Sequence, residues 1–462
     1  MVGVGAAEVK IAFDTWKEGN VGASQQEVAV VAPRLELKLE PVSQRLMGSL
    51  QHPNRKGILH GLRYSPDGRR LIAGDYPGGV VQVWDTEFGK QLTKIETGYG
   101  FRGTAEYFSL APEWSSIYVS RDKRSFSRIE KDGKQMIRWE FDGDIRAWDL
   151  ASGELRETFK HDPPRNIVAM KLSPDGSTIV TVDELPGEFE GRAPRAGSLW
   201  NVRSKQYRPL PDWFRFYGEF APDSKTMAVT TEDAQSYTTA LKVIDLTTAE
   251  EKLSIPVIDG FTQLNIGQCT PDGQSWIGSA RVFPVRNNWQ SWESSLKIWD
   301  AASGDEVASF VLDEKSSNFL YEVSPDGRIL VATNMMGDIA KLYLFDLPNR
   351  MLLKTIILGE QIIVRKPVFS PDGNWIAVIT QVVPEELRRS NFVDAQDLPQ
   401  PRIHLVEVAA AAVRETIVAP QAVAASACFS PDGNTLATGG NGKVLLWDLT
   451  KPLGTADAEC GK

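Results

Sequence analysis

The chain has 462 residues, of which 42% are hydrophobic and 24% charged, as in ordinary folded proteins with a large apolar core. Its formal charge of -9 gives an acidic surface that repels phosphate backbones, so we expect no nucleic-acid partner. No run of about 18 apolar residues occurs, so we also expect no membrane span.

Few side chains of the metal-binding types are present. The three cysteines form no Cys-x-x-Cys pair and there are only four histidines, which argues against a disulfide framework and a cysteine or histidine metal centre. We therefore expect no cofactor. The cysteine usage fits a reducing compartment, and residues 1–20 carry Glu8, Lys10 and Asp14 where a secretory signal would be apolar. We expect a cytoplasmic protein.

Residues 1–42 precede a series of repeats. Two apolar stretches, residues 28–31 and 35–39, have the composition of short strands. We expect an N-terminal extension whose strands cap the domain that follows.

A tetrapeptide of the form Ser-Pro-Asp-Gly recurs from residue 65 onward and defines the organisation of the chain. The intact copies begin at Ser65, Ser173, Ser324, Ser370 and Ser430. Weaker copies begin at Ala111, Ala221 and Thr270. The eight copies are 46 to 62 residues apart, a spacing that indicates tandem structural repeats.

Each copy predicts a tight hairpin between two alternating apolar strands. Proline presets φ for a type I turn, and glycine supplies a position with positive φ. A third strand then ends in an aromatic or aliphatic residue followed by an acid or amide, as in Trp148-Asp149, and the acid opens the next turn. A fourth strand, such as residues 154–160, completes the unit.

Four of these third-strand endings are intact Trp-Asp pairs, at Trp84, Trp148, Trp299 and Trp447. With four short strands per repeat, residues 44–449 resemble the WD-repeat family. The resemblance implies a β-propeller that binds other macromolecules, and we expect these four tryptophans to be structural residues between blades. Propellers found beside periplasmic translocation proteins carry the same turn, so the subfamily stays open.

The sequence departs from the family pattern in its polar residues. The family's Gly-His pair is absent from every unit, and its Asp or Asn six residues before the tryptophan occurs only at Asp142 and Asn441. We therefore expect that the family's Asp-His-Ser-Trp network is not formed and that apolar packing holds the blades. His52 and His161 are interpreted as repeat remnants rather than ligands.

The two ends of the repeat region complement each other. Too little chain follows Trp447-Asp448 for a fourth strand, whereas residues 45–51 resemble the fourth strands elsewhere. The predicted fold is all-β, an eight-bladed β-propeller of four-stranded antiparallel blades closed by this N-terminal strand, which removes exposed sheet edges. The expected boundaries are an extension over 1–42, a propeller over 43–449 and a tail over 450–462.

Length variation is concentrated in the loops between second and third strands, at residues 121–142, 183–197, 281–294 and 381–402. Loops entering the first strand, at 98–104 and 211–215, join the same face. These loops are rich in arginine and aromatic residues, the types that dominate binding hot spots. The candidate partner-binding residues are Phe101, Arg102, Arg124, Phe126, Arg192, Trp213, Arg286, Trp289, Trp292, Arg388 and Arg389.

Residues 121–138 form the most basic segment, with seven basic and three acidic side chains. Such a segment can dock an acidic partner or phosphate, but a solvated hairpin insertion is the interpretation we favour.

No catalytic motif is present: there is no Gly-x-Ser-x-Gly elbow, phosphate-binding loop, His-Glu-x-x-His or haem-attachment pattern. We therefore predict a monomeric, non-enzymatic scaffold that binds a protein or other macromolecule on its loop-rich face. The alternative is a propeller enzyme or small-ligand binder with its site at the mouth of the central channel.

Overall fold

The computed structural model describes residues 10–12, 43–53, 57–76, 78–98, 108–121, 123–214, 218–232, 239–255, 261–283, 293–312, 319–334, 336–383, 392–394, 399–420 and 423–451. All regular secondary structure in these residues is β-strand. In the same ranges no helix is long and apolar enough to cross a membrane.

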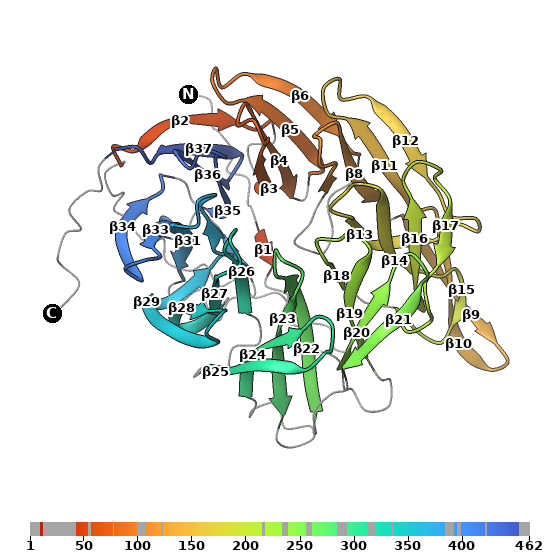
Figure 1. Ribbon diagram of the computed structural model, residues 1–462. Coiled ribbons are helices and arrows are strands. Elements are labelled where there is room, and N and C mark those ends of the chain that lie inside the picture. Colours follow the sequence, from red (N-terminus) through yellow and green to blue (C-terminus); the bar gives the residue numbers. More distant parts are fainter. Residues whose placement is uncertain are drawn as a thin grey trace, which may run out of the picture.

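Four-stranded antiparallel sheets repeat along the chain and are arranged around a common centre (Figure 1). The first unit contains β3 (Ile58–Tyr64), β4 (Arg70–Tyr76), β5 (Val80–Asp85) and β6 (Gln91–Glu96). The second contains β7 (Ser109–Leu110), β8 (Ser116–Arg121), β11 (Asp144–Asp149) and β12 (Leu155–Phe159). The third contains β13 (Asn166–Leu172), β14 (Thr178–Glu184), β16 (Arg195–Asn201) and β17 (Tyr207–Pro209). The fourth contains β18 (Gly218–Phe220), β19 (Thr226–Glu232), β20 (Thr239–Asp245) and β21 (Glu250–Ile255).

The fifth unit contains β22 (Phe261–Cys269), β23 (Ser275–Phe283), β24 (Glu293–Asp300) and β25 (Glu306–Leu312). The sixth contains β26 (Phe319–Val323), β27 (Ile329–Asn334), β28 (Met336–Asp346) and β29 (Met351–Val364), and the seventh β30 (Val368–Phe369), β31 (Trp375–Val382), β33 (Arg402–Glu407) and β34 (Ala412–Val418). These two units form one sheet because β29 pairs with β28 and then, at residues 362–364, with β31.

The last unit combines strands from both ends of the chain. It contains β35 (Ala424–Phe429), β36 (Thr435–Gly440), β37 (Lys443–Asp448) and the N-terminal β2 (Leu46–Gln51). Strand β2 pairs antiparallel with β37, and Leu46 lies opposite Trp447. The described residues thus contain eight four-stranded units.

The last unit contacts the first. Ile58 of β3 forms a β-bridge with Asn441, and the hydroxyl of Ser426 donates a hydrogen bond of 3.0 Å to the carbonyl of Leu59. Leu50 and Val444 of the last unit share one apolar cluster with Leu59 and Trp84 of the first. Figure 1 shows β35 and β3 as neighbours around the ring.

The hairpin turns have the geometry that the tetrapeptide predicts. Its glycines have φ between 72° and 75°, and in the weak copies Trp114 and Ser224 take the same place with φ of 59° and 61°. Side chains fix the turn, as where Ser173 Oγ donates to Asp175 Oδ1 at 2.6 Å. A Cβ atom on Gly176 would lie 2.8 Å from Pro112 of the preceding unit, so the turns also pack against one another.

The four Trp-Asp tryptophans are all buried. Each lies in an apolar cluster that two adjacent units share: Trp84 between the last and first, Trp148 between the first and second, Trp299 between the fourth and fifth, and Trp447 between the seventh and last. Aromatic side chains therefore fill the space between neighbouring sheets.

The third unit corrects the expectation that no Asp-His-Ser-Trp network forms. Nε2 of His161 lies 3.1 Å from Ser198 Oγ and 3.1 Å from Asp183 Oδ2, and the Ser198 hydroxyl donates to Asp183 at 2.5 Å. The indole of Trp200 contacts the His161 ring at 4.6 Å and donates to Thr181 Oγ1 at 3.2 Å. The expectation was wrong because the aspartate lies within the second strand, at Asp183 of β14, rather than preceding the tryptophan by six residues.

Outside these units, β1 (Lys10–Ala12) pairs with β32 (Phe392–Asp394). The strands predicted at 28–31 and 35–39 lie outside the described residues, as does most of the predicted tail.

Candidate functional site

Four of the eleven candidate partner-binding residues lie in the described part of the chain: Arg124, Phe126, Arg192 and Trp213. Of these, Trp213 is half-buried against the apolar cluster between the third and fourth units, and the Lys242 ammonium lies 4.8 Å from its ring. It is therefore a packing residue. The candidates outside the described residues are Phe101, Arg102, Arg286, Trp289, Trp292, Arg388 and Arg389.

The loops of two adjacent units meet in a small additional sheet, which we call the insert sheet. It consists of β9 (Arg124–Lys131), β10 (Lys134–Phe141) and β15 (Gly187–Phe189), in the order β15-β10-β9. Asp132 and Gly133, with φ of 53° and 76°, form the β9–β10 turn, as an Asp-Gly pair favours. The sheet lies at the outer margin of the ring (Figure 1). The predicted loop at 121–142 is thus a hairpin insertion.

Ion pairs cover one face of the insert sheet. Glu188 accepts from Lys131 at 2.9 Å and from Arg138 at 2.7 Å, and Lys134 pairs with Glu190. The Lys131 ammonium, followed by the Arg138 guanidinium, holds the pKa of Glu188 below its ordinary value. Acidic residues of the third unit thus neutralise much of the basic segment, which removes support for a phosphate-docking role on this face.

The buried end of the same segment is also paired. Arg121 donates through Nε and Nη2 to the two carboxylate oxygens of Asp144, at 2.9 and 2.7 Å, and both residues are buried. Asp142, the residue that the family pattern singled out, is partly exposed and pairs with Lys123 at 2.8 Å. Lys123, then Lys160, lowers the pKa of Asp142 to about 2, against desolvation.

The opposite face is aromatic, and we call it the aromatic face. Phe126 lies opposite Trp139 with ring centroids 5.2 Å apart, and Ile137 lies between Arg128 on β9 and Phe189 on β15. Residues directly opposite one another project from the same side of a sheet, so these side chains share one face. Phe126 is 61% exposed.

Trp139 lies between two of the candidate partner-binding residues, Phe126 and Arg192. Its indole donates a hydrogen bond of 3.0 Å to the carbonyl of Gly191, beside the exposed Arg192, while its ring contacts Phe126. Arg124 stands at the start of β9 with Nη1 3.5 Å from Glu184 Oε2. Sequence reasoning missed Trp139 because it treated residues 121–142 as one loop, although the Asp-Gly turn fixes the register that places Trp139 opposite Phe126.

Arg128 is an exposed cation of the aromatic face, on which Arg124 also stands. It follows Phe126 by two residues, and no described acidic group forms an ion pair with it. Exposed aromatic and arginine side chains in one place can anchor a partner through apolar contact and directional hydrogen bonds.

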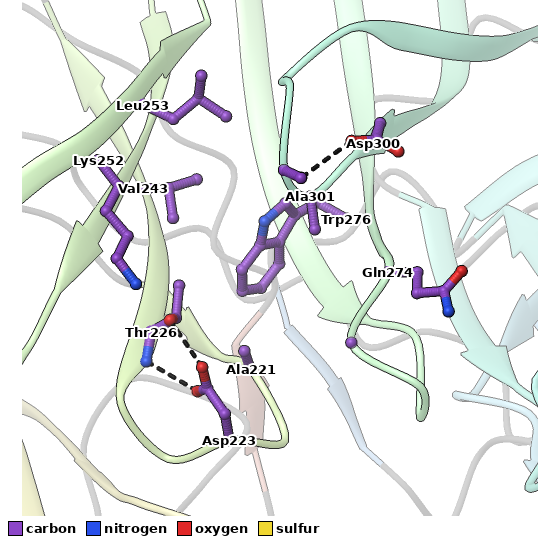
Figure 2. A pocket seen from close by; sticks show the side chains of 12 residues that line it. Ala221, Asp223, Thr226, Val243, Lys252, Leu253, Gln274, Trp276, Asp300 and Ala301 are labelled. Atoms are coloured by element: carbon purple, nitrogen blue, oxygen red, sulfur yellow. Dashed lines mark hydrogen bonds between the residues drawn. The ribbon is translucent and has the colours of Figure 1, made fainter.

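A cavity of about 500 Å³ lies between the fourth and fifth units, among their hairpin turns. Figure 2 shows Val243 and Leu253 on one side and Trp276 and Ala301 on the other. Asp223, Lys252 and Asp300 are the charged residues of its lining.

Paired charges lie on or beside the first strands of neighbouring units. Glu219 forms an ion pair with Lys171 of the preceding unit, and Glu322 forms one of 2.5 Å with Lys366 of the following unit.

Across the ranges that the structure describes, no group of three His, Cys, Asp or Glu side chains is placed to hold a metal ion.

Comparison with known proteins identifies the fold and one repeat. A family model described as WD40, "WD domain, G-beta repeat", matches residues 417–448, which contain β35, β36 and β37. No curated protein matches the chain in sequence.

Several solved structures are similar to the chain. The C-terminal WD40 domain of Sif2 is 14% identical, with a TM-score of 0.53 over 87% of this chain and 97% of that one. A eukaryotic initiation factor is also 14% identical, with a TM-score of 0.52 over 86% and 87% of the two chains. The dihydro-heme d1 dehydrogenase NirN, in complex with DHE, is 12% identical, with a TM-score of 0.55 over 85% and 76%. At these identities the likeness shows the fold alone, so the chain has a β-propeller fold, and residues 417–448 match the WD-repeat family model.

Proposed function

We propose that this protein is a non-enzymatic scaffold that binds a protein partner on the aromatic face of the insert sheet. Fold does not fix function, so the proposal rests on the site. The observation that carries it is the row of Phe126, Trp139 and Phe189 on one side of a three-stranded sheet whose other side is occupied by ion pairs.

A small sheet gains most of its stability by packing an apolar face against another layer. On the insert sheet, Phe126 stays 61% exposed, so that layer can be supplied by a partner. Arg128 stands on the same face, and the partner surface that fits therefore offers an apolar group beside a carboxylate. We further propose that the protein is a cytoplasmic monomer and that its partner is not a nucleic acid.

Quantitative affinity purification from the native cell tests the proposal with a matched pair of variants. Phe126→Ala removes the exposed ring, whereas Ser127→Ala changes the next residue, which is also exposed but points to the ion-paired face. A truncated hot-spot side chain costs ~2 kcal/mol or more, which is about a 30-fold loss of affinity. We expect Phe126→Ala to lose partners that Ser127→Ala keeps, and an identical set of partners for both variants would contradict the proposal.

A further inference from the structure

The residue after the third-strand acid or amide has a common role in most units. It is aliphatic in six of them, and each time it joins the apolar cluster between its own unit and the preceding one: Leu150, Val202, Leu246, Leu347, Val408 and Leu449. These side chains fill the gap between neighbouring sheets near the turns. The first unit has Thr86 at this position, and the fifth has Ala301, which packs against the corresponding cluster with a smaller side chain.

The cavity of about 500 Å³ lies at Ala301. Alanine lacks the carbon atoms that leucine or valine places in the corresponding gap, and Figure 2 shows Ala301 facing the gap that Val243 and Leu253 bound on the other side. The wall also contains Trp276, which is buried and whose indole N–H has no hydrogen-bond partner among the described residues. The indole nitrogen is itself buried, so Trp276 presents its apolar ring to the cavity.

The charged lining of the cavity is acidic overall. Asp223 and Asp300 both line it, and each accepts backbone hydrogen bonds from its own turn, as where Ala302 N donates to Asp300 at 2.9 Å. The lining cation, Lys252, lies 3.1 Å from Asp245 and is already paired. The lining itself thus holds two carboxylates and one cation that is paired with a third carboxylate, which favours a positively charged neighbour of the inserted group.

We propose that the cavity at Ala301 receives an aliphatic side chain of a partner peptide, with a lysine or arginine of that peptide beside Asp223 and Asp300. The inserted side chain takes the place that the protein's own leucine or valine has in six other units. Apolar anchors that fill a preformed pocket dominate peptide affinity, and the carboxylates fix the orientation of the bound segment. This site is separate from the insert sheet and does not depend on the function proposed for it.

Isothermal titration of the full chain tests this site with two synthetic peptides, acetyl-Lys-Leu-Arg amide and its acetyl-Lys-Ala-Arg counterpart. We expect the leucine peptide to bind at least ~10-fold more tightly than the alanine peptide. Ala301→Leu should fill the cavity and weaken binding of the leucine peptide at least ~10-fold, whereas Thr86→Val, at the same turn position in the first unit, should leave it unchanged. A wild-type protein that does not bind the leucine peptide, or an Ala301→Leu variant that binds it equally well, overturns the proposal.

A second variant removes charge instead of adding volume. Asp300→Asn keeps the turn, since Asn201 has the equivalent position in the third unit and accepts from Ser204 N at 2.8 Å. We expect Asp300→Asn to lower the affinity for the leucine peptide several-fold at low salt. An unchanged affinity would overturn the role of the carboxylate. Phe126→Ala should bind the peptide as the wild type does, which separates this test from that of the insert sheet.

Discussion

Leu50 provides the sharpest test of how the two ends of the chain join. It lies on the N-terminal strand β2, is only 3% exposed, and packs in a cluster with Val444 of the last unit and Leu59 of the first. Replacing it with alanine removes apolar contacts from both units at once. For a buried leucine this loss, with the cavity that remains, amounts to about 2–5 kcal/mol of the free energy of unfolding.

Met47 of the same strand is the matched control, because it is 57% exposed. Urea titration followed by tryptophan fluorescence should give a lower midpoint for Leu50→Ala, whereas Met47→Ala should change stability by no more than about 0.5 kcal/mol. If the two variants unfold together, β2 does not complete the last unit in solution. The prediction of an eight-bladed closed ring would then lose its main support.

Three further changes address the interior. Trp299→Ala should cost about 3–5 kcal/mol, measured by denaturant titration, because this buried indole fills the space between the fourth and fifth units. Ser198→Ala should cost about 1–3 kcal/mol in the same assay, since it removes the buried hydroxyl that hydrogen-bonds to both His161 and Asp183. Burial, followed by the charge of Arg402, lowers the pKa of His404 from 6.5 to about 4. Between these pH values the unfolded chain therefore binds a proton at His404 that the folded protein does not, and the free energy of unfolding should fall as the pH drops from 6.5 towards 4. The variant His404→Gln should flatten this part of the profile of stability against pH. An unchanged slope in the variant would contradict the role given to His404.

The repeat architecture could be predicted from the sequence because its turns are local. Proline, aspartate and glycine act on the backbone angles of their own four residues, so each copy specifies a hairpin without reference to the rest of the chain. The weak copies at Ala111 and Ala221 form the same turn, because Trp114 and Ser224 adopt the backbone conformation of the missing glycine.

The polar network of the third unit could not be predicted in the same way. His161 and Asp183 are 22 residues apart and meet only after the strands of the unit have paired. A search for fixed spacing therefore does not find them, and the sequence pattern alone leads to the interpretation of His161 as a repeat remnant.

The candidate site was predicted only in outline. Phe126 and Arg192 belong to different units, and they approach the same tryptophan because β15 pairs with β10. The cavity at Ala301 likewise depends on packing between two units, so a single alanine in one turn gives no sign of it in the sequence until all eight turns are aligned.

Hydrogen exchange on the complex with the captured partner tests the functional proposal most directly. Amide exchange in residues 124–141 should slow on binding, because this hairpin forms β9 and β10 of the aromatic face. Residues 91–96 of β6, on a fourth strand remote from the insert sheet, should exchange as in the free protein. Protection elsewhere on the ring with unchanged exchange over 124–141 would contradict the proposal that the insert sheet is the docking surface.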